Sequence, residues 1–342
     1  MTVPPPPQKL RSRWRTIEPI IRRTGHWLNW LSIGLFVCWL LGRVFGRFYF
    51  FELFSHFQVQ YVWLAYVLLL LQGFCLRIDS IRSQSGLVLI PISLLAVVIY
   101  FEDRNWVPRY TSEPPKTPGD IRVLHANVLY TRDEYDTTIA LIRQQHPNLY
   151  VLQEMTPQSI RLVTSELHNE FPHWFACWSK GPCWVLVGSR TPFKVDQGLA
   201  RKWRVVSLKT RVKDQDVALV TVHPRTPILP SWFRERNAQL AHVANATRQS
   251  PLPTVLIGDF NISVFSPIYK DIFETNDNEQ KASLKSARSV LTQPTWPRFI
   301  PPMMIPIDHA FVNSGFYTQS FQTLEHPGSD HKAVVVDLGF TR

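Results

Sequence analysis

The chain has two parts with different patterns of hydrophobic and polar residues. Up to about residue 101 long apolar runs dominate, and three windows contain no charged side chain: 24–42, 53–76 and 83–101. Each has close to the roughly 20 residues that a helix needs to cross about 30 Å of hydrocarbon. The pattern predicts three transmembrane helices, the third with Pro91 inside it, which membrane helices tolerate. A buried helical hairpin or a cleaved signal peptide is the alternative, although a signal peptide has one apolar core.

Lys and Arg are distributed unevenly around these windows. Eight lie on the side of the N-terminus, six before the first window and two in the loop after the second, and five lie on the other side. Cytoplasmic loops of membrane proteins carry the excess of Lys and Arg. We therefore expect residues 1–23 to be a basic cytoplasmic tail, residues 24–101 the membrane region, and the chain after three crossings to be extracytoplasmic.

A proline-rich segment follows the membrane region. Residues 102–119 include Pro114, Pro115 and Pro118, and such a composition is typical of a semi-rigid spacer. We expect a linker here, followed by a separate domain that covers residues 120–342.

Beyond the linker, short apolar runs alternate with polar turns. The expected strands cover residues 121–129, 149–153, 174–176, 183–188, 205–211, 217–221, 255–257, 307–312, 316–321 and 333–338. The expected helices cover residues 135–145, 159–167 and 233–248, and Thr156 is a candidate N-cap. So many strands with few helices favour an α/β domain of two packed mixed β-sheets flanked by helices.

The net charge of +11 would be typical of a nucleic-acid-binding protein, but its position weakens that interpretation. Residues 1–101 hold 10 Lys/Arg and 3 Asp/Glu, or +7, whereas residues 102–342 hold 27 and 23, or +4. A groove for DNA or RNA is the alternative, with Lys202, Trp203 and Arg204 as its candidate start. The charge does not favour it.

Polar side chains stand at the ends of the expected strands. They are Asn127, Glu154, His223, Asp259 with Asn261, Asp308, and Asp330 with His331. The ends of strands in one sheet meet at one rim, where α/β folds place their sites. Each residue alone has an ordinary interpretation as a turn or strand end. Together they predict a site for phosphoester hydrolysis.

Acidic and amide groups suit the metal and the water in such a site. Glu154 offers a carboxylate oxygen to Mg²⁺, with Mn²⁺ as an alternative, and Asp330 completes the metal or water network. Asp259 is expected to orient or deprotonate the attacking water. Asn261, two residues later, is expected to fix its direction.

The histidines and two further residues suit the phosphate. His331, held in one tautomer by Asp308, is expected to stabilise a non-bridging oxygen, and His223 the leaving oxygen. Asn127 is a candidate for substrate binding. Arg190 is a candidate for phosphate binding, although an exposed arginine after a strand is the ordinary alternative.

Two cysteines and one apolar loop leave alternatives open. Cys177 and Cys183 flank a turn-like link, so either a disulfide in an oxidising compartment or two buried thiols is consistent. Residues 228–233 place apolar side chains just after His223. They could contact lipid or an acyl chain, or pack in the core.

These motifs resemble the endonuclease/exonuclease/phosphatase superfamily over about residues 120–338. The matching positions are Asn127, Gln153-Glu154, His223, Gly258-Asp259-Phe260-Asn261, Ile307-Asp308-His309 and Ser329-Asp330-His331. The resemblance implies a four-layer α/β sandwich and Mg²⁺-dependent phosphoester cleavage. By it Glu154 is the metal ligand, Asp259 and Asn261 handle the nucleophile, His223 acts on the acid side, and Asp308 orients His331.

Apolar windows ahead of such a domain look like the membrane-anchored bacterial branch that includes proteins of the VanJ and YafD types. This resemblance implies a multi-pass protein of the bacterial inner membrane with a periplasmic catalytic domain. The expected substrate is a lipid-linked phosphate or pyrophosphate, or a phospholipid headgroup. A DNase I-like nuclease is the alternative activity, and a non-enzymatic membrane scaffold is a third class. No protein partner is inferred.

Overall fold

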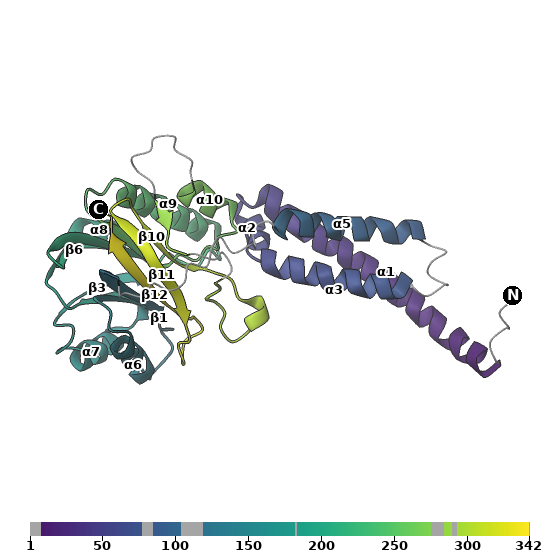
Figure 1. The fold of residues 1–342 in the computed structure, drawn as a ribbon, viewed down its shortest axis with the longest axis horizontal. Coiled ribbons are helices and arrows are strands. Elements are labelled where there is room, and N and C mark those ends of the chain that lie inside the picture. Colours follow the sequence, from purple (N-terminus) through teal and green to yellow (C-terminus); the bar gives the residue numbers. More distant parts are fainter. Residues whose placement is uncertain are drawn as a thin grey trace. The chain divides into compact units, whose positions relative to one another are not determined.

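The computed structural model describes residues 8–76, 85–103, 119–181, 183–274, 284–288 and 293–341 (Figure 1). The chain divides into two compact units, residues 1–107 and 108–342. The division falls inside the predicted linker, of which residues 104–118 lie outside the described part. Each unit is considered by itself.

The N-terminal unit is helical. Its helices are α1 (Gln8–Phe45), α2 (Tyr49–Ser55), α3 (Gln58–Leu76) and α5 (Ser85–Asp103). Helices α1, α3 and α5 pack together through a core of Leu28, Leu35, Ala65, Leu68 and Leu95. Because α1 begins at Gln8, most of the predicted basic tail is helical.

The prediction of three membrane-spanning helices is met by only one helix in the described part of the chain. Residues Arg23–Phe45 are long and apolar enough to cross a bilayer, with a mean hydropathy of 1.6 over their most apolar window. In the second predicted window, Tyr49–Ser55 and Gln58–Phe74 pass the same test only as a pair, and they are bent by 57° at the break between them. The third window begins outside the described residues and contributes the shorter apolar stretch Ile90–Phe101.

The second unit contains two six-stranded mixed sheets. The first has the order β11-β12-β1-β2-β4-β3, and the second has the order β5-β6-β7-β8-β10-β9. The strands of the first sheet are β1 (Ile121–Asn127), β2 (Leu149–Met155), β3 (His173–Lys180), β4 (Cys183–Ser189), β11 (Phe316–Leu324) and β12 (Ala333–Phe340). Those of the second are β5 (Phe193–Val195), β6 (Val205–Val212), β7 (Gln215–Val222), β8 (Thr254–Asp259), β9 (Lys285–Ser286) and β10 (Asp308–Val312).

Helices cover both outer faces of the two sheets (Figure 1). They are α6 (Asp136–Gln145), α7 (Pro157–Glu166), α8 (Gln197–Trp203), α9 (Pro230–Arg248) and α10 (Pro267–Phe273). One buried apolar cluster lies between the sheets, and a second lies between the first sheet and α6 and α7. The predicted α/β domain of two mixed sheets flanked by helices is therefore confirmed.

Most predicted strands and helices are present, with ends shifted by a few residues. Thr156 caps α7 as expected, because its hydroxyl accepts a hydrogen bond from the Ser159 backbone N–H in a capping box. The sequence pattern did not indicate the short elements β5, α8, α10 and β9. A few residues give too little periodicity to distinguish a short element from a loop.

Cys177 and Cys183 are not joined by a disulfide, so of the two alternatives the structure has the buried thiols. The register of β3 and β4 explains this, since Cys177 lies opposite Val185 and Cys183 lies opposite Lys180.

The strand pairing brings the polar strand ends to one rim. Strands β1 and β2 are parallel, with Asn127 opposite Gln153, and β7 and β8 are parallel, with Thr221 opposite Ile257. Strand β10 runs antiparallel to β8 and begins with Asp308 opposite Asp259. Carboxyl ends of parallel strands thus meet the amino end of an antiparallel neighbour.

Gln153 joins the two sheets at this rim. Its side-chain N–H groups donate to the Thr221 hydroxyl and to the Val222 carbonyl at 3.1 Å, and its carbonyl accepts from the Asp259 N–H at 2.9 Å. Gly258 leaves room for this contact, because a Cβ there would lie 2.5 Å from the Val222 carbonyl oxygen and 2.8 Å from the Gln153 amide nitrogen.

We expect Gly258→Ala to destabilise the second unit by about 1–3 kcal/mol, because the added methyl group must push apart β7, β8 and Gln153. Thermal and denaturant unfolding of the purified chain measure this. Gly198→Ala is the matched control, since its Cβ meets only the exposed Asp196 carboxylate, at 3.2 Å. Equal unfolding midpoints for the two variants would contradict the expectation.

Candidate active site

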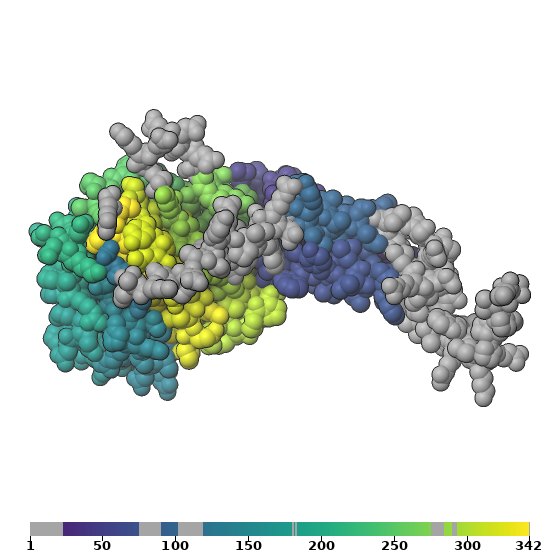
Figure 2. Space-filling model, in the orientation of Figure 1, coloured from purple at the N-terminus to yellow at the C-terminus, as the bar shows by residue number. Residues whose placement is uncertain are grey.

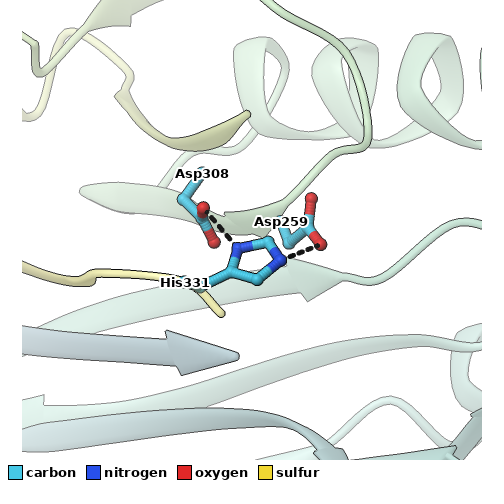
Figure 3. Close-up of side chains that lie close together, drawn as sticks. All are labelled: Asp259, Asp308 and His331. Atoms are coloured by element: carbon cyan, nitrogen blue, oxygen red, sulfur yellow. Dashed lines mark hydrogen bonds and ion pairs between the residues drawn. The ribbon is translucent and has the colours of Figure 1, made fainter. Parts of the chain in front are cut away.

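Asp259, Asp308 and His331 lie together at the rim of the second sheet (Figure 3). The Nδ1 atom of His331 is 2.9 Å from Asp308 Oδ2, and its Nε2 atom is 3.8 Å from Asp259 Oδ2. Asp259 ends β8, Asp308 begins β10, and His331 precedes β12 in the first sheet. The site therefore forms only when the two sheets pack.

Asp308 is fully buried between two imidazoles. His331 contacts one carboxylate oxygen and His125 Nε2 contacts the other, each at 2.9 Å. The backbone is fixed as well, because the Asp308 N–H donates to Thr295 Oγ1 at 3.2 Å and its carbonyl accepts from the buried guanidinium of Arg288 at 2.6 Å. Both oxygens are thereby occupied by protein partners.

These contacts set the charge of the pair. Burial by itself would raise the pKa of Asp308, but the charges and hydrogen bonds of His331 and His125 hold it well below its usual range. Burial by itself would lower the pKa of His331, but Asp308, Asp259 and Asp330 raise it to about 9. His331 is therefore a cation at neutral pH, with Nδ1 donating to Asp308 and Nε2 directed to Asp259.

Asp259 is surrounded by donors. Its Oδ2 accepts from Asn127 Nδ2 at 3.2 Å and lies 3.6 Å from His223 Nε2, while its Oδ1 accepts from the Asn261 N–H at 2.9 Å. Burial opposes ionisation, but His223 and His331 outweigh it and the pKa of Asp259 is lowered. An ionised carboxylate at this position can accept a hydrogen bond from a water molecule without being protonated itself.

Glu154 reaches the same place from the first sheet. It lies in an irregularity of the β2–β4 pairing and has φ 62°, in the left-handed region. A bulge of this kind turns a side chain out of its regular alternation. Glu154 Oε1 lies 3.6 Å from His223 Nε2, the distance at which Asp259 also lies, and Oε2 accepts from the Tyr130 N–H at 3.4 Å.

Asn261 holds the turn after β8. It has φ 51°, and its side chain donates to the Pro224 carbonyl at 3.2 Å, next to His223. The buried guanidinium of Arg236 donates to the Asn261 carbonyl at 2.8 Å. The predicted pair of Asp259 and Asn261 is thus brought together, and Asn261 also orients the loop that carries His223.

Asp330 has a partner that the sequence did not indicate. Its Oδ2 accepts from the Trp296 indole N–H at 2.8 Å, and its charge contributes to the raised pKa of His331. Among the described residues it does not belong to the group of Asp259, Asp308 and His331 whose ligand atoms lie within 4.8 Å of one another. Its role as a metal ligand stays a prediction.

Arg190 does not lie with the other predicted residues. It follows β4, and because β4 is antiparallel to β2, its neighbour Ser189 pairs with Leu149 at the start of β2, whereas Glu154 is near the end of that strand. Its guanidinium donates to the Pro147 carbonyl at 2.8 Å and lies 4.7 Å from the centre of the Phe171 ring. The structure therefore does not bring Arg190 together with the other predicted residues, and its role in binding the substrate phosphate stays a prediction.

The donor chemistry decides which side chains suit a divalent metal. Asp259, Asp308 and His331 are close enough to hold one. However, a protonated imidazole has no lone pair to offer, and Asp308 already binds two imidazoles. Glu154 and Asp259 instead each present a carboxylate oxygen 3.6 Å from His223 Nε2, and oxygen is the donor that Mg²⁺ prefers. The donor chemistry of Glu154 thus fits the predicted metal, with the Asp259 carboxylate beside the same histidine.

Several buried groups that position the site were not expected. They are His125 and Arg288 on Asp308, Gln153 on Asp259, Arg236 on Asn261, and Trp296 on Asp330. Gln153 and His125 lie inside apolar strands, where a polar residue is a usable signal. Arg236 and Arg288 gave no such signal, since surface arginines have the same sequence context.

In the metal-free protein we expect the His331 ring to titrate near pH 9, and Asp308→Asn to lower that pKa toward about 6.5. Because the folded-state pKa is raised, the Asp308–His331 pair contributes stability fully below about pH 6.5, and this stability is lost as the pH rises through about 9. NMR of ring-labelled histidines measures the titration, with His331→Asn identifying the signal. A wild-type ring that titrates near 6.5 would disprove the assigned charge.

Comparisons with known proteins support the fold. A family model described as the Endonuclease/Exonuclease/phosphatase family matches residues 124–331. A humanized D. rerio TDP2 with 14 mutations has 14% identity and a TM-score of 0.51, covering 64% of this chain and 98% of that one. An endonuclease/exonuclease/phosphatase from Beutenbergia cavernae has 20% identity and a TM-score of 0.50, covering 64% and 71%.

A search of curated proteins found no match. The solved structures share the fold at identities too low to indicate a substrate, and the finer resemblance to the VanJ and YafD types stays a prediction. The family model covers more than half of the chain, between one strand end and the last candidate histidine. The chain belongs to the endonuclease/exonuclease/phosphatase family, whose members are metal-dependent phosphoester hydrolases.

Proposed function

We propose that the protein is a membrane-anchored, Mg²⁺-dependent phosphoesterase that hydrolyses a lipid-linked phosphate or pyrophosphate, or a phospholipid headgroup, on the extracytoplasmic side. The observation that carries the hydrolytic part is the cluster at the rim, where a cationic His331 and an ionised Asp259 lie 3.8 Å apart with Glu154 beside His223. It combines a carboxylate for water, a cation for phosphate and oxygen ligands for a metal.

The residues divide the work of hydrolysis. Asp259 accepts a hydrogen bond from the attacking water and directs it at phosphorus, while Asn127 and the Asn261 N–H hold the carboxylate. His331 places positive charge where a non-bridging oxygen gains negative charge, and Asp308 keeps it protonated and oriented. A metal held by Glu154 would supply further charge neutralisation to the phosphate.

His223 suits the leaving group. Its Nε2 lies 3.6 Å from both Glu154 and Asp259, so it can donate to an oxygen that gains charge as the bond breaks. It is buried and follows β7 directly, which fixes its position.

The membrane part of the proposal is supported by the apolar helix Arg23–Phe45 and by the distribution of Lys and Arg around the apolar windows. Anchoring an enzyme in the bilayer that contains its substrate raises their effective concentration. This favours a lipid-linked substrate over a soluble one.

The side chains predicted to begin a nucleic-acid groove make contacts within the protein. The Trp203 ring is stacked on His242 at 4.4 Å, and the Arg204 guanidinium lies 4.4 Å from the centre of the Trp178 ring and 3.0 Å from Glu235 Oε1. These side chains are less available to stack on bases. Because D. rerio TDP2, which has the same fold, was solved with a single-strand DNA product, DNA belongs in the substrate panel.

We expect Asp259→Asn and His331→Gln each to lower kcat by about 10²–10³ or more, because each removes a charge that acts in the transition state. Hydrolysis of lipid pyrophosphates, phospholipids and DNA by the purified chain, with Mg²⁺ and with EDTA, measures this. Arg190→Gln is the control, since Arg190 lies away from the site, and it should keep full activity. Full activity of the Asp259 variant would refute the assignment, and DNA as the best substrate would favour a nuclease.

We expect a C-terminal alkaline phosphatase fusion to be active and a C-terminal fluorescent protein fusion to be dark in bacterial cells. One or three crossings put the catalytic unit on the side opposite to the N-terminus, whereas two crossings, Arg23–Phe45 and the bent pair, return it to the same side. A fluorescent fusion without phosphatase activity would place the catalytic unit in the cytoplasm.

A further inference from the structure

A hairpin beside the active site carries an exposed apolar tip. Residues 295–305, here called the apolar hairpin, connect Thr295 to Ile305 through a short 3₁₀ turn at Pro301–Met303. Five consecutive apolar residues, 299–303, are exposed, including Phe299 at 61% and Ile300 at 54%. Figure 1 shows this segment extending away from the sheets, and in Figure 2 it reaches the surface. Contiguous apolar surface of this kind marks an interaction site.

The base of the hairpin is fixed by hydrogen bonds. Trp296 and Ile305 exchange backbone hydrogen bonds at 3.1 and 2.6 Å. The tip is therefore held by a single antiparallel bridge.

The base of the hairpin is also hydrogen-bonded to the loop that carries Asp330 and His331. The Trp296 indole donates to Asp330 Oδ2 at 2.8 Å, the Arg298 N–H donates to the Asp330 carbonyl at 2.7 Å, and the Lys332 N–H donates to the Thr295 carbonyl at 2.9 Å. Thr295 Oγ1 also accepts from the Asp308 N–H at 3.2 Å. The tip, Asp308 and His331 are thus parts of one hydrogen-bonded assembly.

We propose that the apolar hairpin inserts its tip into the surface of a lipid bilayer and so presents the active site to a phosphate group at that surface. The tip has Phe, Ile, Pro and Met and no charge, the composition of segments that enter the boundary between headgroups and acyl chains. The base of the hairpin carries Trp296, an amphipathic side chain suited to the interface. Two cations there, Arg298 and Lys332, are paired with Glu325, and Asp330 lies beside them.

Two further features favour a bilayer over another occupant. The chain carries the apolar helix Arg23–Phe45, so the catalytic unit works close to lipid if that helix is inserted. A second exposed apolar pair, Ile228 and Leu229, lies between His223 and α9, on a loop that leaves the same rim. The identity of the substrate as a lipid rests on the proposed function, whereas contact with the bilayer does not.

The contact has a specific consequence for activity. A substrate embedded in a bilayer keeps its phosphate group at the membrane surface. The active site must therefore be held at that depth. A small soluble phosphodiester has no such requirement. Loss of the apolar tip should therefore impair hydrolysis in bilayers and leave soluble substrates unaffected.

The first test compares two triple variants of the full chain in vesicles. Phe299→Ser/Ile300→Ser/Met303→Ser should reduce hydrolysis of an embedded polyprenyl diphosphate by about tenfold or more, with unchanged hydrolysis of bis(p-nitrophenyl) phosphate. The matched control is Leu162→Ser/Trp174→Ser/Tyr317→Ser, which removes side chains that are 42%, 48% and 48% exposed elsewhere on the unit. Unchanged lipid hydrolysis in the hairpin variant, or an equal loss on both substrates, would overturn the proposal.

The second test does not depend on activity. An environment-sensitive fluorophore on Ile300→Cys, in the full chain in phospholipid nanodiscs, should be quenched by spin-labelled acyl chains and protected from aqueous iodide. The same fluorophore on Lys213→Cys, at an exposed position in the turn between β6 and β7, should show the reverse. Quenching of position 300 by iodide alone, or shielding from both quenchers by covering protein, would overturn the proposal. If the wild-type chain hydrolysed no lipid, the proposed function would fail while this measurement still decided the bilayer contact.

Discussion

The buried carboxylate of Asp308 is the interaction on which the site depends. A fully buried charge is costly unless partners replace its water, and here two imidazoles do so, while the Arg288 guanidinium binds the backbone carbonyl of the same residue. In return Asp308 keeps His331 protonated, which a buried imidazole otherwise resists. The partners come from β1, from the loop before β12 and from the segment after β9, so the charge of His331 depends on the packing of both sheets. The charge of His331 and the folding of this unit therefore depend on the same contacts.

Gln153 makes the same connection in the backbone. Its amide bridges β2 to β7 and β8, and it fixes the N–H of Asp259, while the next residue, Glu154, leaves the strand through a bulge. A regular strand would direct Glu154 to the opposite face from Gln153. The bulge changes that direction and brings a carboxylate beside His223. One irregular position thus allows the first sheet to contribute to a site built on the second.

The sequence was informative where a pattern is local. Apolar strands ending in Asn127, Asp259 or His223 were visible, and parallel pairing explains why those ends meet. What the sequence could not supply were contacts that exist only after packing. Arg236 and Arg288 reach backbone carbonyls 25 and 20 residues away, and nothing near them in the sequence indicates a buried role. Arg190 shows the limit of this pattern, because in the sequence the end of an antiparallel strand looks like the end of a parallel one until the pairing is known.

The strand-end pattern predicted the position of Asp330 correctly, but it did not indicate the partner that its carboxylate binds. The sequence placed an acid next to His331, and the acid is there, but its carboxylate binds the indole of Trp296 at the base of the apolar hairpin. From that position it still adds to the positive character of His331 through charge. Asp330 also connects the hairpin to the His331 imidazole, because it binds Trp296 and directly precedes His331 in the chain. The backbone bridge between Trp296 and Ile305 fixes the base of the hairpin, so the exposed tip is connected through Trp296 to the residue beside His331.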